Sequence, residues 1–379
     1  MTITFIIITL LYLFLIGRIV LGFDKVKVTR LEDIAPKTKF TVIVPFRNEA
    51  ENLPALLDSI LKLNYPKDLF DIIFVDDDSE DDSVEIINSI LSKRPLDSTQ
   101  GDISIIKNNR TTNSPKKDAI SLAIQQAKSE WIVTTDADCI LPKYWLDSYD
   151  CFIQKNQAKL IAAPVTYNNS EGFLNAFQTL DFLSLIGATI GGFGIDKPFL
   201  CNGANLAYQK EFFESLNGFE GNTKIASGDD IFLLEKALKA DKNAVSYLKS
   251  KHAIVTTKPQ STLKQLLSQR LRWASKTSNY NNRFAKLVGL LVLVTNAMIV
   301  VGLVLAILGL FKFKTFAYLF FIKIAIDFLL IYKTSQFFSK ENMLKHYVWC
   351  CLLYPFFSVY VAFISLFMTY KWKGRQFKK

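Results

Sequence analysis

Residues that build zinc sites are scarce in this sequence. It has two histidines in 379 residues, and no two of its five cysteines are spaced as a Cys-x-x-Cys pair. Zinc sites in proteins need clustered cysteine and histidine ligands. The composition therefore argues against a zinc protein.

Acidic residues are missing from one long segment. Between Lys242 and Ile326 there is no aspartate or glutamate, while basic residues crowd the start of the longest apolar run. By the positive-inside rule such a flank faces the cytoplasm, where the cysteines stay reduced. Because these residues lie beside a membrane helix, anionic lipid is the expected partner and nucleic acid is not. They are Lys258, Lys264, Arg270, Arg272, Lys276, Arg283 and Lys286, and Lys25, Lys27 and Arg30 follow the first apolar run.

Charge is also missing from several stretches long enough to cross a bilayer. Residues 4–17 and the 24 residues Leu287–Leu310 are uncharged, and Tyr347–Tyr370 is almost as apolar. Thr315–Tyr332 is weaker, because Lys323 and Asp327 fall four residues apart on one helical face. Those two side chains either pair inside a bundle or keep the segment at the interface. The number of spans, and so the side of the basic C-terminus, stays open.

These runs predict a multi-pass membrane protein with a polar domain between its anchors. The expected parts are an N-terminal anchor, a polar α/β domain, a basic interfacial segment, further membrane helices and a basic tail. They cover residues 1–23, 24–256, 257–286, 287–370 and 371–379, respectively.

The polar domain alternates short apolar runs with helical patterns. KFTVIVP, DIIFVD, ISII and WIVTTD read as strands, and helical segments separate them. Nearly continuous apolar strands separated by helices predict a mostly parallel sheet covered on both faces. The fold class is therefore α/β. A later segment, Gly172–Ile190, carries a single charge and is expected to be a helix that is buried or lies at the membrane surface.

Polar clusters follow three of the predicted strands. They are Arg47-Asn48-Glu49, Asp76-Asp77-Asp78 and Asp136-Ala137-Asp138. Ligands of such sheets bind outside the carboxyl ends of the strands, so three loops are expected to meet at one rim.

Each acidic cluster has a structural and a functional interpretation. Asp136 and Asp138 either cap a turn and a helix, or hold Mg²⁺ or Mn²⁺ on a diphosphate. Asp229 and Asp230, at a predicted helix start, either serve the helix end or include a general base whose neighbour raises its pKa. Lys116 and Lys117 are either solvated or bind phosphate.

The segment QRLRW (residues 269–273) precedes the long membrane helix. One interpretation is an interfacial helix with an aromatic anchor and snorkelling arginines. The other is that Arg272 meets a leaving diphosphate while Trp273 forms the floor of a sugar pocket.

Taken in order, these motifs resemble family 2 of the inverting glycosyltransferases, which have a GT-A nucleotide-sugar fold. The matching segments are VPFRNEAENL, FVDDDSEDDS, SPKKDAISLAI, TTDAD, SGDDIFLL and QRLRW. The last resembles the (Q/R)xxRW motif of the membrane-embedded branch, which includes cellulose synthases and ceramide glucosyltransferase. The resemblance covers about residues 39–273. Arg47, Asp229 and Pro115 depart from the commoner aromatic, glutamate and glycine of the family.

The resemblance implies a role for each matched residue. Asp77, with Pro45, Arg47 and Glu49, would bind the nucleotide, and Lys116 the phosphates. Asp138, assisted by Asp136, would hold Mn²⁺ or Mg²⁺, and Asp230 would be the base. Gln269, Arg272 and Trp273 would line the donor and acceptor sites, and Asn202 and Gly203 the acceptor side.

We therefore expect a membrane-bound enzyme that transfers a sugar from a nucleotide-sugar, with a UDP-sugar first, to a lipid or lipid-linked saccharide. The alternatives are a processive polysaccharide synthase, an inactive nucleotide-binding scaffold and a tethered nucleotidyltransferase. The retained Asp77, Asp138, Asp230 and Arg272 count against the scaffold. The nucleotidyltransferase would need a phosphate-binding glycine loop and leaves QRLRW without a role.

Overall fold

The structure is a computed structural model that describes residues 1–92, 102–223, 225, 227–277, 279–367, 370–372 and 375–377. The chain forms two compact units. The α/β unit contains Lys27–Asn168 and Cys201–Lys258, and the helical unit contains Met1–Val26, Asn169–Leu200 and Pro259–Lys379. Of the expected basic tail, residues 373–374 and 378–379 lie outside the described part of the chain.

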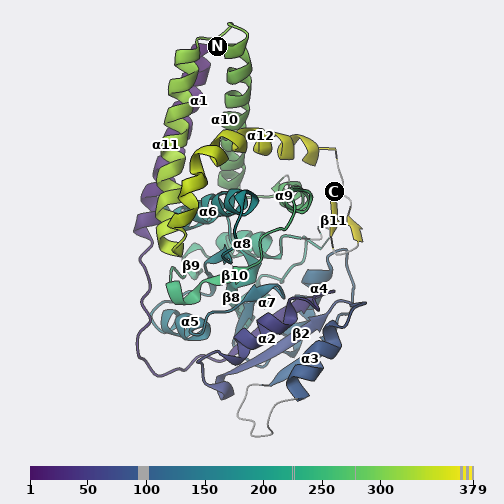
Figure 1. The fold of residues 1–379 in the computed structure, drawn as a ribbon. Helices are drawn as coiled ribbons and strands as arrows, with labels where there is room; N and C mark the ends of the chain where they lie inside the picture. The colour runs from purple at the N-terminus through teal and green to yellow at the C-terminus, as the bar shows by residue number, and fades with distance from the viewer. Residues whose placement is uncertain are drawn as a thin grey trace. The chain divides into compact units, whose positions relative to one another are not determined.

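The described residues of the α/β unit form a seven-stranded sheet in the order β3-β2-β1-β4-β8-β6-β9 (Figure 1). The first four strands in that order are parallel, which confirms the predicted mostly parallel sheet. The strands are β1 (Phe40–Phe46), β2 (Phe70–Asp76), β3 (Ile103–Lys107), β4 (Trp131–Thr134), β6 (Leu160–Ala162), β8 (Leu206–Gln209) and β9 (Val245–Tyr247).

Helices cover both faces of the parallel part of this sheet. α2 (Leu53–Leu61) connects β1 to β2, and α3 (Ser83–Ser92) connects β2 to β3. Because both connections run in the same direction along the sheet, the two helices lie on one face and pack beside each other. The crossover through α4 (Pro115–Gln126) runs back to β4, and right-handed connection therefore places α4 on the other face, against β1 and β2. The central strand β1 is consequently buried on both sides, and Phe40, Val42 and Ile43 are fully buried.

The second half of the unit is less regular than the first. β8 enters the sheet antiparallel to both β4 and β6. A separate small sheet has the order β5-β10-β7. The remaining elements are β5 (Cys139–Ile140), α5 (Trp145–Ile153), β7 (Val165–Tyr167), α7 (Lys210–Ser215), α8 (Asp229–Ala240), β10 (Val255–Thr257) and the 3-10 turns η1 (Lys67–Leu69), η2 (Gly203–Asn205), η3 (Lys242–Ala244) and η4 (Lys251–Ala253).

The helical unit is built from long apolar helices. Among the described residues, five helices are long and apolar enough to cross a membrane, which indicates a membrane protein. They are α1 (Thr2–Lys25), α6 (Phe173–Gly194), α10 (Arg283–Ile307), α11 (Phe313–Phe338) and the segment Glu341–Ser365, which holds η5 (Glu341–His346) and α12 (Tyr347–Ser365). The unit also contains α9 (Leu263–Thr277) and the short strands β11 (Tyr370–Trp372) and β12 (Arg375–Phe377).

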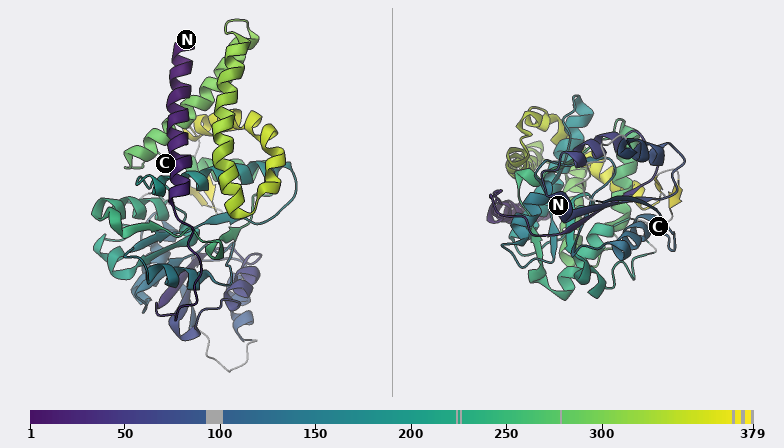
Figure 2. Two further views of the ribbon diagram at one scale, coloured as in Figure 1. Left: turned by 90° about the vertical axis from the view of Figure 1, so that its left-hand side faces the viewer. Right: turned by 90° about the horizontal axis from the view of Figure 1, so that it is seen from below.

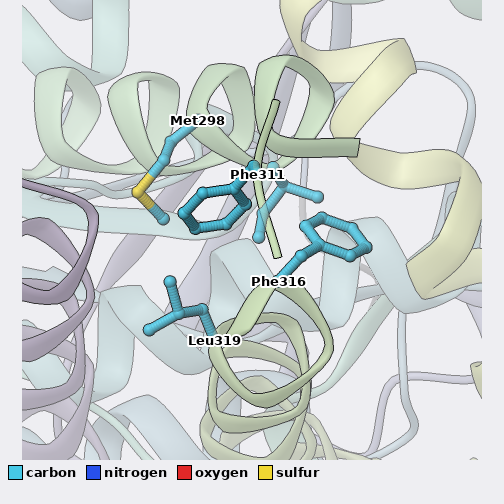
Figure 3. Packing of buried hydrophobic residues seen from close by; sticks show 5 residues of the cluster. Met298, Phe311, Phe316 and Leu319 are labelled. Carbon is cyan, nitrogen blue, oxygen red and sulfur yellow. The ribbon is translucent and has the colours of Figure 1, made fainter. Parts of the chain in front are cut away.

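Helices α1, α10 and α11 run side by side (Figures 1 and 2). α10 and α11 form a hairpin whose turn contains Gly309 at a φ of 71°, a conformation that favours glycine. Figure 3 shows the apolar cluster behind this turn, in which Met298 of α10 meets Phe316 and Leu319 of α11 around Phe311. The cluster fixes the hairpin through side-chain packing.

α1 and α6 approach each other at backbone contact distance. A Cβ atom placed on Gly191 would lie 2.3 Å from the Ile19 carbonyl oxygen, and one on Gly22 would lie 2.2 Å from the Gly191 carbonyl oxygen. Small residues allow such close crossings in the absence of a hydrophobic driving force between helices. α6 is therefore a buried helix of this unit, which is the first of the two interpretations that its sequence left open.

Lys323 and Asp327 form an ion pair, which is the first of the two interpretations that the sequence left open for them. Lys323 Nζ lies 2.9 Å from Asp327 Oδ2, and the lysine side chain is only 2% exposed. Tyr12 of α1 donates a hydrogen bond of 2.7 Å to Asp327 Oδ1, so the pair also joins α11 to α1. A charge pair inside an apolar helix is tolerated when each partner satisfies the other.

Candidate active site

The loops that follow β1 and β2 are held together by polar contacts. Arg47 Nη1 donates to the Asp77 carbonyl at 2.8 Å, and its Nη2 contacts Glu80 Oε1 at 2.7 Å. Asn48, at a φ of 51°, accepts a hydrogen bond from the Glu80 amide and donates its own amide to Ser79. The two strand ends therefore form one rim, as the parallel register predicts.

The carboxylate of Asp77 is held by residues from the third strand end. Arg110 Nε donates to Asp77 Oδ1 at 2.6 Å, and Asn108 Nδ2 donates to the same oxygen at 2.8 Å. Sequence reasoning missed both residues, although Asn108-Asn109-Arg110 directly follows β3 in the same way that the three named clusters follow their strands. By contrast, Asp76 accepts a hydrogen bond from the Ser79 amide and shapes the turn.

Lys116 joins two of the predicted acidic motifs. Its Nζ lies 2.6 Å from Asp136 Oδ1 and 3.2 Å from Asp229 Oδ2. Burial alone would lower the pKa of Lys116, but the carboxylates of Asp136, Asp229 and Asp230 outweigh burial and raise that pKa above its ordinary value. The loop after β4 and the start of α8 are therefore both in contact with the ammonium group of Lys116.

Lys117, the neighbouring lysine, has a structural role. It is 1% exposed, and its Nζ donates to the carbonyls of Asn222 and Ile225 at 2.7 and 2.9 Å. It also lies 5.0 Å from the centre of the Phe232 ring. These contacts fix the segment before α8, so the structure does not support a phosphate-binding role for Lys117.

The two aspartates that begin α8 lie against Gly203. The Gly203 amide donates to Asp230 Oδ2 at 3.3 Å. A Cβ atom on Gly203 would come within 2.7 Å of Asp229 Oδ2, so only glycine fits here without a shift. Both carboxylates lie in the first turn of α8, where the positive end of the helix dipole favours them. The segment that we expected on the acceptor side and the predicted base are thus in contact.

A buried asparagine positions the segment that carries Gly203. Asn205 is fully buried, accepts hydrogen bonds from Trp145 and Tyr149 at 2.8 Å each, and donates to the carbonyls of Pro164 and Ala253. Its side-chain amide is therefore satisfied on both sides. No periodicity of the sequence signals this residue, because its partners come from three distant segments.

The other predicted residues of the α/β unit lie on the same rim. Pro45 is in the last part of β1, and Glu49 is 8% exposed and accepts from Asn52 Nδ2 at 2.6 Å. Asn202 caps η2 by accepting from the Ala204 amide at 3.0 Å. Asp138 follows Asp136 in the loop after β4, where Cys139 Sγ lies 3.8 Å from Asp138 Oδ1.

Gln269, Arg272 and Trp273 belong to the helical unit, on α9. Between them, Arg270 is 6% exposed, and its Nε lies 2.7 Å from Asp181 Oδ2 of α6. The Arg270 guanidinium also lies 4.2 Å from the centre of the Trp273 ring. Arg270 is a further residue to which sequence reasoning gave no role in the site.

The chemistry of the β4 loop suits a hard divalent cation. No group of three His, Cys, Asp or Glu side chains that could hold a metal occurs among the described residues. Asp136 and Asp138 instead offer two carboxylates, and Mg²⁺-type sites commonly combine one or two carboxylates with substrate phosphates and water. The residues therefore fit a cation that binds together with a diphosphate.

A separate hollow lies at the opposite edge of the sheet. It has a volume of about 880 Å³ and is lined by Lys39 before β1, Lys128 and Glu130 before β4, and Lys159 before β6. These residues precede the parallel strands, whereas the motif residues follow them. The hollow is therefore distinct from the rim that carries the predicted site.

Two family profiles match the chain. The profile of Glycosyl transferase family 2 matches residues 41–216, and that of Glycosyl transferase family group 2 matches residues 131–363. Together they cover the α/β rim and most of the helical unit. The chain belongs to glycosyl transferase family group 2, and its fold is GT-A-like.

The chain is also similar over part of its length to proteins that are named after a polymer. The chain is 27% identical over 219 residues to a poly(ribitol-phosphate) beta-glucosyltransferase of Bacillus spizizenii, which covers 55% of this chain and 31% of the relative. It is 31% identical over 148 residues to a poly-beta-1,6-N-acetyl-D-glucosamine synthase of Staphylococcus epidermidis, which covers 37% of this chain and 32% of the relative. The chain thus spans about a third of the length of these two relatives.

One solved structure resembles the chain along almost its whole length. It is the mannosyltransferase PcManGT from Pyrobaculum calidifontis in complex with GDP-Man and Mn²⁺. The match has a TM-score of 0.53 at 17% identity and covers 96% of each chain. At this identity the likeness establishes the fold alone.

Proposed function

We propose that this chain is a membrane-bound, inverting glycosyltransferase that moves a sugar from a nucleoside diphosphate sugar to a hydroxyl of a lipid or lipid-linked saccharide. The observation that carries the proposal is the convergence of three motifs around Lys116. The β4 carboxylate Asp136, the α8 carboxylates Asp229 and Asp230, and Gly203 of the acceptor-side segment all lie within its reach. An in-line displacement of a diphosphate needs a base for the acceptor hydroxyl and positive charge beside the leaving group, and Asp230 and Lys116 are the groups offered for these two tasks.

The proposed base is Asp230. It removes the proton from the acceptor hydroxyl as the hydroxyl oxygen attacks the anomeric carbon from the side opposite the diphosphate. The bond between that carbon and the diphosphate oxygen breaks in the same step, and the configuration inverts. The contact between Asp230 and Gly203 supports this role, because the resemblance gives Asn202 and Gly203 to the acceptor side.

The leaving diphosphate gains negative charge during this step. Asp138, with Asp136, would hold Mn²⁺ or Mg²⁺, and a bound cation would neutralise part of that charge. Lys116 supplies a fixed positive charge beside Asp136, and Arg272 has the phosphate-side role that the resemblance implies. Gln269 and Trp273 retain their proposed roles at the donor and acceptor.

We assign nucleotide recognition to residues at the ends of β1 and β2. They are Pro45, Arg47, Glu49 and Asp77, which the resemblance gives to the nucleotide. We add Arg110, because its guanidinium fixes the Asp77 carboxylate from the end of β3. The first donor to test is a UDP-sugar, followed by GDP-mannose, with which the structural neighbour is complexed.

We place the enzyme in the cell membrane with its α/β unit in the cytoplasm. The apolar helices support the membrane location, and the basic residues between Lys258 and Lys286 support the orientation. Parts 1–23, 24–256, 257–286, 287–370 and 371–379 keep their proposed roles as anchor, catalytic domain, interfacial segment, membrane helices and tail.

The second candidate function is processive synthesis of a polysaccharide. Similarity to a poly-beta-1,6-N-acetyl-D-glucosamine synthase favours it. Processive relatives usually need more spanning helices to form a channel, and this consideration favours the single addition. A size-resolved product assay distinguishes the two, because a polymerase gives a ladder of chain lengths at low acceptor concentration.

The deciding experiment uses the full chain purified in detergent with a panel of UDP- and GDP-sugars. Release of the nucleoside diphosphate is measured with Mn²⁺, with Mg²⁺ and with chelator. We expect metal-dependent turnover of one donor, lost by about 10²–10⁴-fold in Asp230→Asn. Asp138→Asn is expected to need far more metal for its remaining turnover.

Asp58→Asn is the matched control, because it also removes one carboxylate but lies in an exposed pair with Lys62 on α2. It is expected to keep the turnover of the original chain. A folded protein that turns over none of the donors would point to the nucleotide-binding scaffold instead.

A further inference from the structure

The two arginines of QRLRW point to different sides of α9. Residues two apart on an α-helix are separated by about 160° around its axis, so Arg270 and Arg272 cannot face the same partner. Arg270 lies on the face of the fully buried Leu266, one turn before it, whereas Arg272 is partly exposed. Arg270 therefore faces the interior of the helical unit.

Arg270 is held there by α6. Its Nε lies 2.7 Å from Asp181 Oδ2, and the two side chains are only 7% and 5% exposed. The ion pair thus joins α9 to α6, and α12 packs against both of these helices.

Arg270 also touches two of the three motif residues assigned to the reaction. Its Nη1 donates a hydrogen bond to Gln269 Oε1, and its guanidinium lies 4.2 Å from the centre of the Trp273 ring. The ring of Phe182, the residue after Asp181, lies 6.1 Å from that of Trp273. Adjacent residues of α6 therefore hold the indole of Trp273, one through Arg270 and the other directly.

Stability alone is a weak explanation for this arrangement. A buried ion pair often contributes no more than apolar residues of the same volume would. A planar guanidinium, however, can stack on an indole and bind a carboxylate and a carboxamide at its edge, all at fixed angles. Its geometry is suited to orienting neighbouring side chains.

We propose that Asp181 is a positioning residue for sugar transfer, which acts through Arg270 to fix the side chains of Gln269 and Trp273. This inference rests on the proposed function, in which Gln269 and Trp273 serve the donor and acceptor. Loosening the contact reduces transfer to the acceptor far more than it weakens binding of the donor, because the residues proposed to bind the nucleotide belong to the α/β unit.

The first measurement needs no substrate. The full chain is labelled with 5-fluorotryptophan, and the Trp273 resonance is identified by its loss in Trp273→Phe. Asp181→Asn and Arg270→Lys are expected to broaden or shift that resonance, while Asp181→Glu, which keeps the carboxylate, restores much of it.

The second measurement uses membrane vesicles that contain the full chain and a nucleotide sugar labelled in the sugar. Label in the membrane fraction reports transfer, and free labelled sugar reports hydrolysis. We expect Asp181→Asn to reduce transfer by about 10- to 100-fold, to raise the share of hydrolysis, and to leave the KM of the donor within about twofold.

Asp327→Asn is the control for a merely structural effect. It breaks the ion pair with Lys323 in the same helical unit. We expect it to lower the melting temperature and to leave the Trp273 resonance and the ratio of transfer to hydrolysis unchanged. If Asp181→Asn does not fold, Arg270→Lys tests the same link with its charge retained.

The outcomes separate this inference from the proposed function. Turnover by the original chain, with an unchanged ratio of transfer to hydrolysis in folded Asp181→Asn, overturns the positioning role. A Trp273 resonance that Asp181→Asn and Arg270→Lys leave unchanged also overturns it. Absence of turnover in the original chain rejects the proposed function, and the fluorine spectra then decide alone whether Asp181 orders Trp273.

Discussion

In the α/β unit, Lys116 meets Asp136 at a strand end where the aspartate side chain is 38% exposed. In the helical unit, Arg270 meets Asp181 with 7% and 5% of the two side chains exposed. The first contact is open to water and can exchange partners when an anion or a cation arrives. The second is closed and has one geometry. The contact that we propose to bind a ligand is therefore more exposed to solvent than the contact that we propose to position other side chains.

The largest expected effect comes from breaking the closed pair on one side only. Arg270→Met leaves the Asp181 carboxylate buried without its cation, and we expect a loss of about 3–5 kcal/mol in unfolding free energy. The double variant Arg270→Met with Asp181→Leu removes both charges and should recover most of that loss. Thermal unfolding of the original chain, Arg270→Met, Asp181→Leu and the double variant in one detergent gives the interaction energy. Equal losses in the single and double variants would show that the pair is not a closed unit.

This pair also shows where sequence patterns fail. Strand and helix positions follow from local periodicity, so β1 to β4 and the long apolar helices were predictable. The ion pair of Asp181 with Arg270 joins residues 89 positions apart. The sequence around either residue shows neither which residue it pairs with nor that the pair is buried. The antiparallel pairing of β8 with β4 and β6 and the four hydrogen bonds of the Asn205 side chain also join distant segments, so local patterns do not predict them.

The candidate site could be proposed from the sequence where polar side chains follow a strand end. Asp77 follows β2 directly, and Asp136 and Asp138 lie in the loop after β4. Arg110 from the loop after β3 contacts Asp77, and Lys116 from the first turn of α4 contacts Asp136. Arg110 had the same signal but lacked the acidic character that drew attention to the others. The roles of Gln269, Arg272 and Trp273 are predictions from the resemblance.

A smaller effect is expected at the crossing of α1 and α6, where shape rather than charge sets the geometry. Gly191→Ala would place a methyl group 2.3 Å from the Ile19 carbonyl oxygen, so the two helices must separate. We expect a loss of about 1–3 kcal/mol, typical of overpacking. Gly289→Ala in α10 is the control, since nothing lies within 4 Å of its Cβ position. Similar melting temperatures for both variants would mean that the helices do not pack this closely.

The smallest effect is expected at the open contact. Lys116→Met removes the cation between Asp136 and Asp229, and we expect a loss of only about 1–2 kcal/mol because the contact is partly exposed. Mn²⁺ should raise the melting temperature of this variant more than that of the original chain, because the carboxylates lack another cation. If chelator and Mn²⁺ affect both proteins equally, the carboxylates around Lys116 do not bind the metal.

The pH dependence gives an independent check of the same contact. The pKa of Lys116 is raised above its ordinary value of 10.5, so its contribution is complete below that pH and is lost only as the pH rises through the folded-state pKa. The difference in melting temperature between the original chain and Lys116→Met should therefore be constant from about pH 6 to pH 9. A difference that shrinks within this range would mean that Lys116 loses its proton near neutral pH, which the surrounding carboxylates are expected to prevent.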